Sequence, residues 1–166
     1  MAGMMRGDEE FADFVRSCSA RLTHAAFLLT GDRHQAEDAA QTAFTRTYAA
    51  WSRVGRKNPY AYARRVLANH VIDTWRRPIR EYATEDVPER ERVPDISHVV
   101  TDREWLTDAL GRLTGRERAV VVLRHFFDLA EQQVADELGV SIGTVKSTNS
   151  RALAKLRIDG AALVGR

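Results

Sequence analysis

The chain has 166 residues, of which 44% are hydrophobic and 29% charged, with a net charge of +2. Its length leaves room for one domain or two small helical ones. Cys18 is the single cysteine, which excludes an internal disulfide and a cysteine-based zinc site; we expect it to be a small buried side chain. Because no apolar run approaches roughly 20 residues and the N-terminus lacks a signal-peptide layout, we expect a cytoplasmic protein without membrane insertion.

The charges are unevenly distributed along the chain. Residues 1–77 include 12 Lys/Arg and 8 Asp/Glu, residues 78–102 include 3 and 7, and residues 103–166 include 10 and 8. Helical periodicity fades between residues 78 and 100, where Pro88 and Pro94 also occur. We therefore predict two helical domains, residues 1–77 and 101–166, joined by an acidic, flexible linker at 78–100.

Three amphipathic helices are predicted in the first domain. The first covers about residues 9–29 and ends at Thr30-Gly31-Asp32, where Asp32 can cap a second helix at about 33–51. The third begins at Asn58-Pro59, a cap followed by proline at the first helical position, and runs to about residue 77. Apolar residues recur on one side of each helix. We expect the core side chains to be Phe11, Phe14, Val15, Leu22, Ala25, Leu29, Ala40, Phe44, Tyr48, Trp51, Tyr62, Val66, Leu67, Val71 and Ile72.

The second domain is predicted to hold about four helices. Two of them begin with capping boxes, Thr101-Asp-Arg-Glu104 and Thr114-Gly-Arg-Glu117. The apolar run AVVVL at 119–123 falls within the second capped segment, so it is expected to be helical. With no strand pattern elsewhere, the fold class is all-α, with two small helical domains.

Residues 134–156 have the spacing of a helix-turn-helix. Ala135 is small enough for two helices to cross, Gly139 can end the first in a left-handed conformation, and Ser141 can cap the second. Val140 would fill the space between the helices. The residues expected to face outward, toward phosphates and base edges, are Thr144, Lys146, Ser147, Thr148, Ser150 and Arg151. This pattern predicts a DNA-binding element; a helical hairpin with an ordinary solvated face is the alternative.

Both halves of the chain resemble the extracytoplasmic-function group of bacterial sigma factors. The resemblance rests on LLTGDRHQAEDAAQTAFTRTYAAW and NPYAYARRVLANHVIDTWRR in the first half, and on LTGRERAVVVLRHFFDLAEQQVADELGVSIGTVKS in the second. It covers roughly residues 10–77 and 101–157. LLTGD and the KSxxSRAL ending resemble a subset found in actinobacteria. The combination is specific, because a helix-turn-helix alone occurs in many regulators.

The resemblance implies a division of roles along the chain. It implies that the polar face of the second helix binds the clamp helices of the largest subunit of bacterial RNA polymerase core, through Asp38, Gln41, Thr42 and Thr45. The third helix would open and read the minus-ten promoter element through Arg64, Arg65, Asn69, Asp73, Trp75, Arg76 and Arg77. The helix-turn-helix would bind the minus-thirty-five element through Ser141, Thr144, Lys146, Ser147, Thr148, Ser150 and Arg151.

Some positions leave alternatives open. Trp51, Tyr60 and Trp75 can stack on unpaired bases, whereas in the alternative Trp51 belongs to the core and Trp75 closes the domain. In the group, positions 148 to 150 are often arginine, leucine and histidine. Losing a cation at Thr148 should weaken duplex binding, and Asn149 must find a hydrogen-bond partner or cost stability.

No enzyme chemistry is expected. The five histidines fall on separate segments without an i,i+4 pair, and neither a phosphate-binding glycine loop nor a nucleophile elbow is present, so we predict no cofactor and no metal. The predicted partners are core polymerase, promoter DNA and, as in some members of the group, an anti-sigma factor. We expect a monomer when free. The alternatives are a free-standing helix-turn-helix regulator, which would usually bind DNA as a two-fold dimer, and a protein-interaction adaptor.

Overall fold

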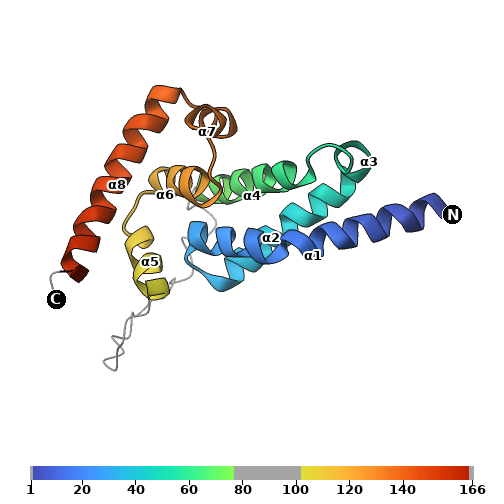
Figure 1. The fold of residues 1–166 in the computed structure, drawn as a ribbon, viewed down its shortest axis with the longest axis horizontal. Helices are drawn as coiled ribbons and strands as arrows, with labels where there is room; N and C mark the ends of the chain where they lie inside the picture. The colour runs from blue at the N-terminus through green and yellow to red at the C-terminus, as the bar shows by residue number, and fades with distance from the viewer. Residues whose placement is uncertain (1, 77–101, 165–166) are drawn as a thin grey trace, which may run out of the picture.

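The computed structural model describes residues 2–76 and 102–164, and the side chains within residues 5–76 and 104–157. The predicted linker at 78–100, Arg77 and Thr101 lie outside the described residues. Within them every regular element is a helix, as the all-α prediction requires (Figure 1). No described helix is both long enough and apolar enough to cross a bilayer.

The first stretch forms α1 (Ala2–Thr30), α2 (Arg33–Ala49), α3 (Trp51–Val54) and α4 (Pro59–Arg76). Two predicted caps are confirmed: the Asp32 carboxylate accepts from Gln35 N–H at 2.9 Å, and the Asn58 amide oxygen accepts from Ala61 N–H at 3.1 Å. Gly31 between α1 and α2 has φ +67°, which suits glycine.

Two helix boundaries differ from the prediction. Helix α1 begins at Ala2 rather than near residue 9, and its early turns are held by a 2.7 Å hydrogen bond from the Tyr48 hydroxyl to Asp8. The predicted second helix breaks at Ala50 into α2 and α3. This break accompanies the packing of Trp51 against Phe11, with ring centroids 5.2 Å apart.

The second stretch forms α5 (Asp102–Gly111), α6 (Gly115–Val121), the π-helical turn η2 (Val122–Phe126), α7 (Glu131–Leu138) and α8 (Ile142–Val164). The segment 119–123 is helical, as predicted. Thr114 Oγ1 accepts from Glu117 N–H at 3.2 Å, which is one half of the predicted capping box. The other half is wrong, because the Glu117 carboxylate binds Lys155 on α8 instead of the Thr114 backbone.

The two stretches share their hydrophobic interior. The larger cluster joins Leu22, Leu29 and Leu67 to Leu110 and Val122, and the smaller one joins Ala68 of α4 to residues of α6, α7 and α8. Hydrophobic contacts therefore join the two predicted domains within the described residues. In Figure 1, α4 and α6 lie side by side at the centre, with α1 and α2 extending to one side and α8 to the other.

Arginines reinforce this shared interior from both sides. Arg118 of α6 donates to the backbone carbonyls of Leu29 at 2.9 Å and Leu110 at 3.0 Å. Burial lowers the pKa of Arg118, because the interior disfavours its charge. Arg21 of α1 donates to the carbonyl of Phe126 at 2.7 Å, and its guanidinium lies 4.7 Å from the centre of the Phe126 ring.

Candidate nucleic-acid and polymerase interfaces

The turn between α7 and α8 has the geometry predicted for a helix-turn-helix. Gly139 ends α7 in the left-handed region, with φ +65° and ψ 36°, and Val140 N–H donates to the Ala135 carbonyl at 3.1 Å. The Ser141 hydroxyl accepts from Thr144 N–H at 3.1 Å and so caps α8. Val145 is fully buried, which fixes the crossing of the two helices. The structure therefore presents the start of α8 as an ordered, exposed helix end.

The predicted DNA-contacting residues of α8 divide by exposure. Thr144 is half-buried, and its hydroxyl lies 2.9 Å from Ser141 Oγ. The exposed side chains are Ser141, Lys146, Ser147, Ser150 and Arg151. The Lys146 ammonium lies 4.0 Å from Glu131 on α7, yet its side chain remains 63% exposed and free to reach a phosphate.

The expectation that Thr148 faces outward is wrong. Thr148 is 1% exposed, because it lies three residues after Val145 and four before Ala152, both of which are fully buried. These offsets place all three on one side of a helix. Its hydroxyl is within 3.4 Å of the Arg151 guanidinium, so Thr148 can support Arg151 without touching DNA itself.

The predicted minus-ten residues of α4 fall on two faces. The exposed face carries Arg65, Asn69, Asp73 and Arg76. The other face turns toward the second stretch, where Arg64 forms an ion pair with Glu137 of α7. Trp75 is 37% exposed and packs closely on Gly115 of α6: a methyl group on that glycine would lie 2.9 Å from Trp75 Cε3.

The remaining aromatic candidates are already engaged within the protein. Trp51 is half-buried beside the rings of Phe11 and Phe14, as the core alternative requires. The Tyr60 hydroxyl accepts from Arg21 at 2.9 Å, and its ring centroid lies 6.3 Å from that of Phe127. Base stacking by either residue requires these contacts to rearrange.

The polar face of α2 is accessible. Asp38, Gln41 and Thr45 are exposed and Thr42 is half-buried. Beside Gln41 and Thr45 an open groove of about 470 Å³ runs between α1 and α2. Its further lining residues are Phe11, Val15, Ser19, Thr23, Glu37, Ala40, Phe44 and Tyr48.

The α1 side of this groove was not among the predicted site residues. Phe11, Val15, Ser19 and Thr23 follow one another at intervals of four, which places them in one row of the helix. That interval was the available signal. The sequence predicts Phe11 and Val15 as core side chains, because an inward apolar row and a groove-lining row have the same period, and it gives no role to Ser19 or Thr23.

Known families match both stretches of the chain. The Sigma-70 region 2 family matches residues 14–80, and the Sigma-70, region 4 family matches residues 103–156. The RNA polymerase sigma-E factor of Streptomyces coelicolor is 41% identical over 150 residues, which cover 89% of this chain and 84% of that protein. The ECF RNA polymerase sigma factor SigL of Mycobacterium tuberculosis is 31% identical over 147 residues, covering 84% and 82%.

This chain belongs to the extracytoplasmic-function sigma factors. A solved structure agrees in fold: the sigma factor RpoE of Bartonella quintana, in complex with the anti-sigma factor NepR, has a TM-score of 0.70 and 25% identity. The match covers 89% of this chain and 96% of that one. The resemblance read from the sequence is therefore confirmed, including its likeness to actinobacterial sigma-E factors.

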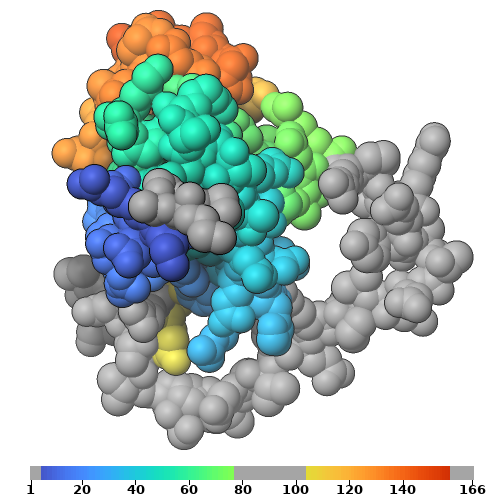
Figure 2. All heavy atoms as spheres, turned by 90° about the vertical axis from the view of Figure 1, so that its right-hand side faces the viewer, coloured from blue at the N-terminus to red at the C-terminus, as the bar shows by residue number. Residues whose placement is uncertain are grey.

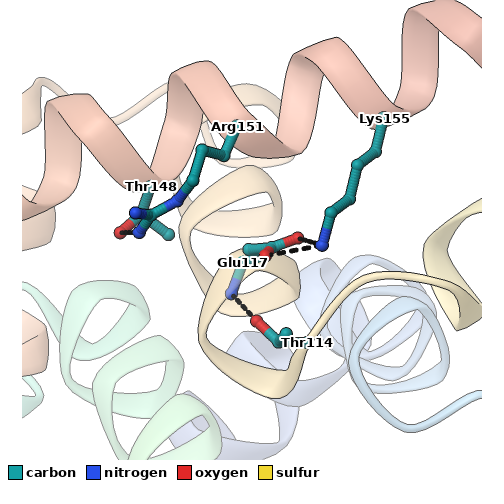
Figure 3. A network of polar contacts seen from close by, with 5 residues as sticks. All are labelled: Thr114, Glu117, Thr148, Arg151 and Lys155. Atoms are coloured by element: carbon teal, nitrogen blue, oxygen red, sulfur yellow. Dashed lines mark hydrogen bonds and ion pairs between the residues drawn. The ribbon is translucent and has the colours of Figure 1, made fainter.

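Polar contacts fix α8 of this sigma factor against α6 (Figure 3). Both carboxylate oxygens of Glu117 lie 2.9 Å from Lys155 Nζ, and the Glu117 side chain is 8% exposed. The Thr114 hydroxyl oxygen accepts a hydrogen bond from the backbone N–H of Glu117. On α8, the departure from the family at Asn149 has a partner, because the amide oxygen lies 2.9 Å from His125 Nε2. These contacts fix the position of α8 along its axis and its rotation about that axis.

Proposed function

We propose that this sigma factor binds bacterial core RNA polymerase and directs it to promoters with minus-ten and minus-thirty-five elements. The observation that carries the proposal is that one chain combines an exposed helix-turn-helix with an exposed polar and basic face on α4, each within a matched sigma-70 region. A free-standing regulator requires only the first of these features.

The minus-thirty-five element would be read by α8 in the major groove. Lys146 and Arg151 supply cations for phosphates, while Ser147 and Ser150 present hydroxyls to base edges. The free N–H groups of the Ser141-capped helix end add a favourable site for a phosphate. Thr148 acts indirectly, through the position of Arg151.

The minus-ten element would be held by α4 as single strands. Arg65 and Arg76 can follow the phosphates, and Asn69 and Asp73 between them can read base edges. Extruding a base costs a few kcal/mol, which these contacts must offset. Trp75 can add stacking once it leaves Gly115.

The polymerase contact is assigned to α2. Asp38, Gln41 and Thr45 form an exposed polar row, and the neighbouring groove offers apolar surface for a helix of the largest subunit. An anti-sigma factor is a further proposed partner, supported by the solved complex of RpoE with NepR. We expect the free protein to be a monomer, because a sigma factor acts as one copy in a larger assembly.

Run-off transcription from a pool of genomic fragments tests this proposal. Core polymerase from an actinobacterium is supplied with and without the chain. Transcripts that depend on the chain would support the proposal, and aligning their upstream regions would reveal both elements. If no transcript depends on the chain and the chain binds DNA without polymerase, the result would favour the free-standing regulator instead.

A further inference from the structure

Ile142, the first residue of α8, presents an aliphatic side chain to solvent. It is 40% exposed and belongs to neither hydrophobic cluster of the described residues. Among the side chains described within residues 104–157, it is the one large hydrophobic side chain that is exposed. A single exposed apolar side chain is common on proteins, so the position of Ile142 decides what its exposure means.

The start of α8 lies at the outer surface of the molecule. Figure 2 shows the orange segment that contains the turn between α7 and α8 at the top, with the blue segments of α1 and α2 below it. Ile142 is four residues before the exposed Lys146, so the two side chains lie in one row of the helix. Ile142 therefore lies beside a proposed phosphate contact, one turn closer to the helix end that contacts base edges in a helix-turn-helix.

The turn does not depend on Ile142 for its shape. Val140 N–H donates to the Ala135 carbonyl at 3.1 Å. The Ser141 hydroxyl caps α8, and the buried side chain of Val145 packs at the crossing of the two helices. The described contacts that hold the turn are thus complete without the side chain of Ile142, which remains available for recognition.

Gly143 leaves room for a close approach to Ile142. The nearest atom to a Cβ built on Gly143 would be Ser141 Oγ, at 3.9 Å. The surface next to Ile142 is therefore backbone without a side chain, which the edge of a base can approach closely.

The chemistry of the major groove suits an aliphatic side chain at this place. The 5-methyl group of thymine is the apolar group that base edges present there. The other exposed side chains at this end of α8, Ser141, Lys146 and Ser147, carry hydroxyl or ammonium groups that pair with phosphates and with hydrogen-bonding base edges. Burying one methyl group is worth about fourfold in affinity. Ile142 can therefore add a selection that hydrogen bonds do not supply.

We propose that Ile142 contacts the 5-methyl group of a thymine in the minus-thirty-five element and is a specificity-determining residue of α8. The inference rests on the proposed function for the identity of the DNA. It requires that at least one thymine lies opposite the start of α8. It also requires that the methyl group of this thymine contributes to affinity only while residue 142 is aliphatic.

Deoxyuridine tests this requirement, because it pairs like thymine and lacks only the 5-methyl group. Promoters found by run-off transcription are remade with each minus-thirty-five thymine replaced in turn. The affinity of core polymerase carrying the chain is then measured for each duplex. The variants are Ile142→Ala, Ile142→Val and, as the matched control, Lys146→Ala. The control removes the neighbouring side chain of the same row, whose proposed contact is with a phosphate.

With the wild type, we expect deoxyuridine to lower the affinity about fourfold at one position. Ile142→Ala should abolish this difference, and Ile142→Val should keep most of it because valine retains a branched aliphatic group. Lys146→Ala should weaken binding to both duplexes and keep their fourfold ratio. An equal ratio for the wild type and Ile142→Ala, or the absence of any sensitive thymine, would overturn the inference.

Thermal unfolding checks that the variants fold. Ile142→Ala should keep Tm within about 2 °C of the wild type, because the side chain is exposed. If its Tm falls further, Ile142→Gln decides, since glutamine keeps a long helix-forming side chain and replaces the aliphatic end by an amide. The affinity ratio of Ile142→Gln should fall to about one. A retained fourfold ratio would overturn the inference.

The experiment separates this inference from the proposed function. If the wild type directs transcription but the affinity ratio is the same for every variant, the inference fails and the proposed function stands. If the wild type directs no transcription, the proposed function fails. The same deoxyuridine scan, on duplexes that the chain alone selects from a random pool, then decides whether Ile142 contacts a thymine methyl group. A chain that selects no duplex would overturn both.

Discussion

Replacing Gly139 by alanine should destabilise the protein through the backbone alone. No atom lies within 4 Å of the place where the alanine Cβ would be, so steric overlap contributes nothing. The cost comes from φ +65°, which a residue with a Cβ adopts at about 1–2 kcal/mol. Alanine also has less conformational entropy to lose on folding than glycine, which offsets about 0.4–1 kcal/mol of this cost. The net loss is about 1 kcal/mol.

Gly143→Ala is the matched control for this prediction. Gly143 also has space for a methyl group, since its nearest neighbour is Ser141 Oγ at 3.9 Å, but it lies in the helical backbone of α8. Alanine there should stabilise by about 0.5 kcal/mol. In a chain of this size 1 kcal/mol shifts Tm by about 2–4 °C, so thermal unfolding should move the two variants in opposite directions. A Gly139→Ala protein as stable as Gly143→Ala would refute the backbone reasoning.

Further predictions concern the two proposed interfaces and one titration. Lys146→Ala and Arg151→Ala should each weaken promoter binding about 5- to 10-fold and reduce its salt dependence, with polymerase binding unchanged in a pull-down. Asp38→Arg should abolish polymerase binding by reversing the charge of the α2 face, and unchanged affinity in a titration would rule that role out. The Asp8 carboxylate raises the pKa of Tyr48 above its ordinary value of 10, because it accepts the phenol hydrogen bond and repels phenolate. The hydrogen bond is therefore present at neutral pH and is lost as pH rises through the raised pKa of Tyr48. Asp8→Asn should lower this pKa, which is measured by following the ultraviolet absorbance of the phenolate.

Local sequence signals predicted the helix-turn-helix well. Gly139 and Ser141 act within a few residues of themselves, so a left-handed turn and a cap could be assigned without knowing the tertiary fold. The same holds for the caps at Asp32 and Asn58. The prediction for Thr148 is wrong because the residue lies three positions after Val145 and four before Ala152, on the buried side of α8.

Contacts between the two halves could not be predicted from local patterns. Arg64 and Glu137 are 73 positions apart, and each reads locally as a charged residue on an amphipathic helix. Glu117 likewise fits a capping box, yet its carboxylate binds Lys155, 38 positions away. Helical periodicity identifies which side of a helix is inward. It does not identify the partner that covers it.

The most direct test of the central claim is a footprint of a promoter found by run-off transcription, with and without core polymerase. We predict that the chain alone leaves the DNA unprotected. Together with polymerase it should protect both the minus-thirty-five and minus-ten regions and leave the minus-ten thymines reactive to a single-strand probe. Protection of paired half-sites by the chain alone would contradict the account and identify a free-standing regulator.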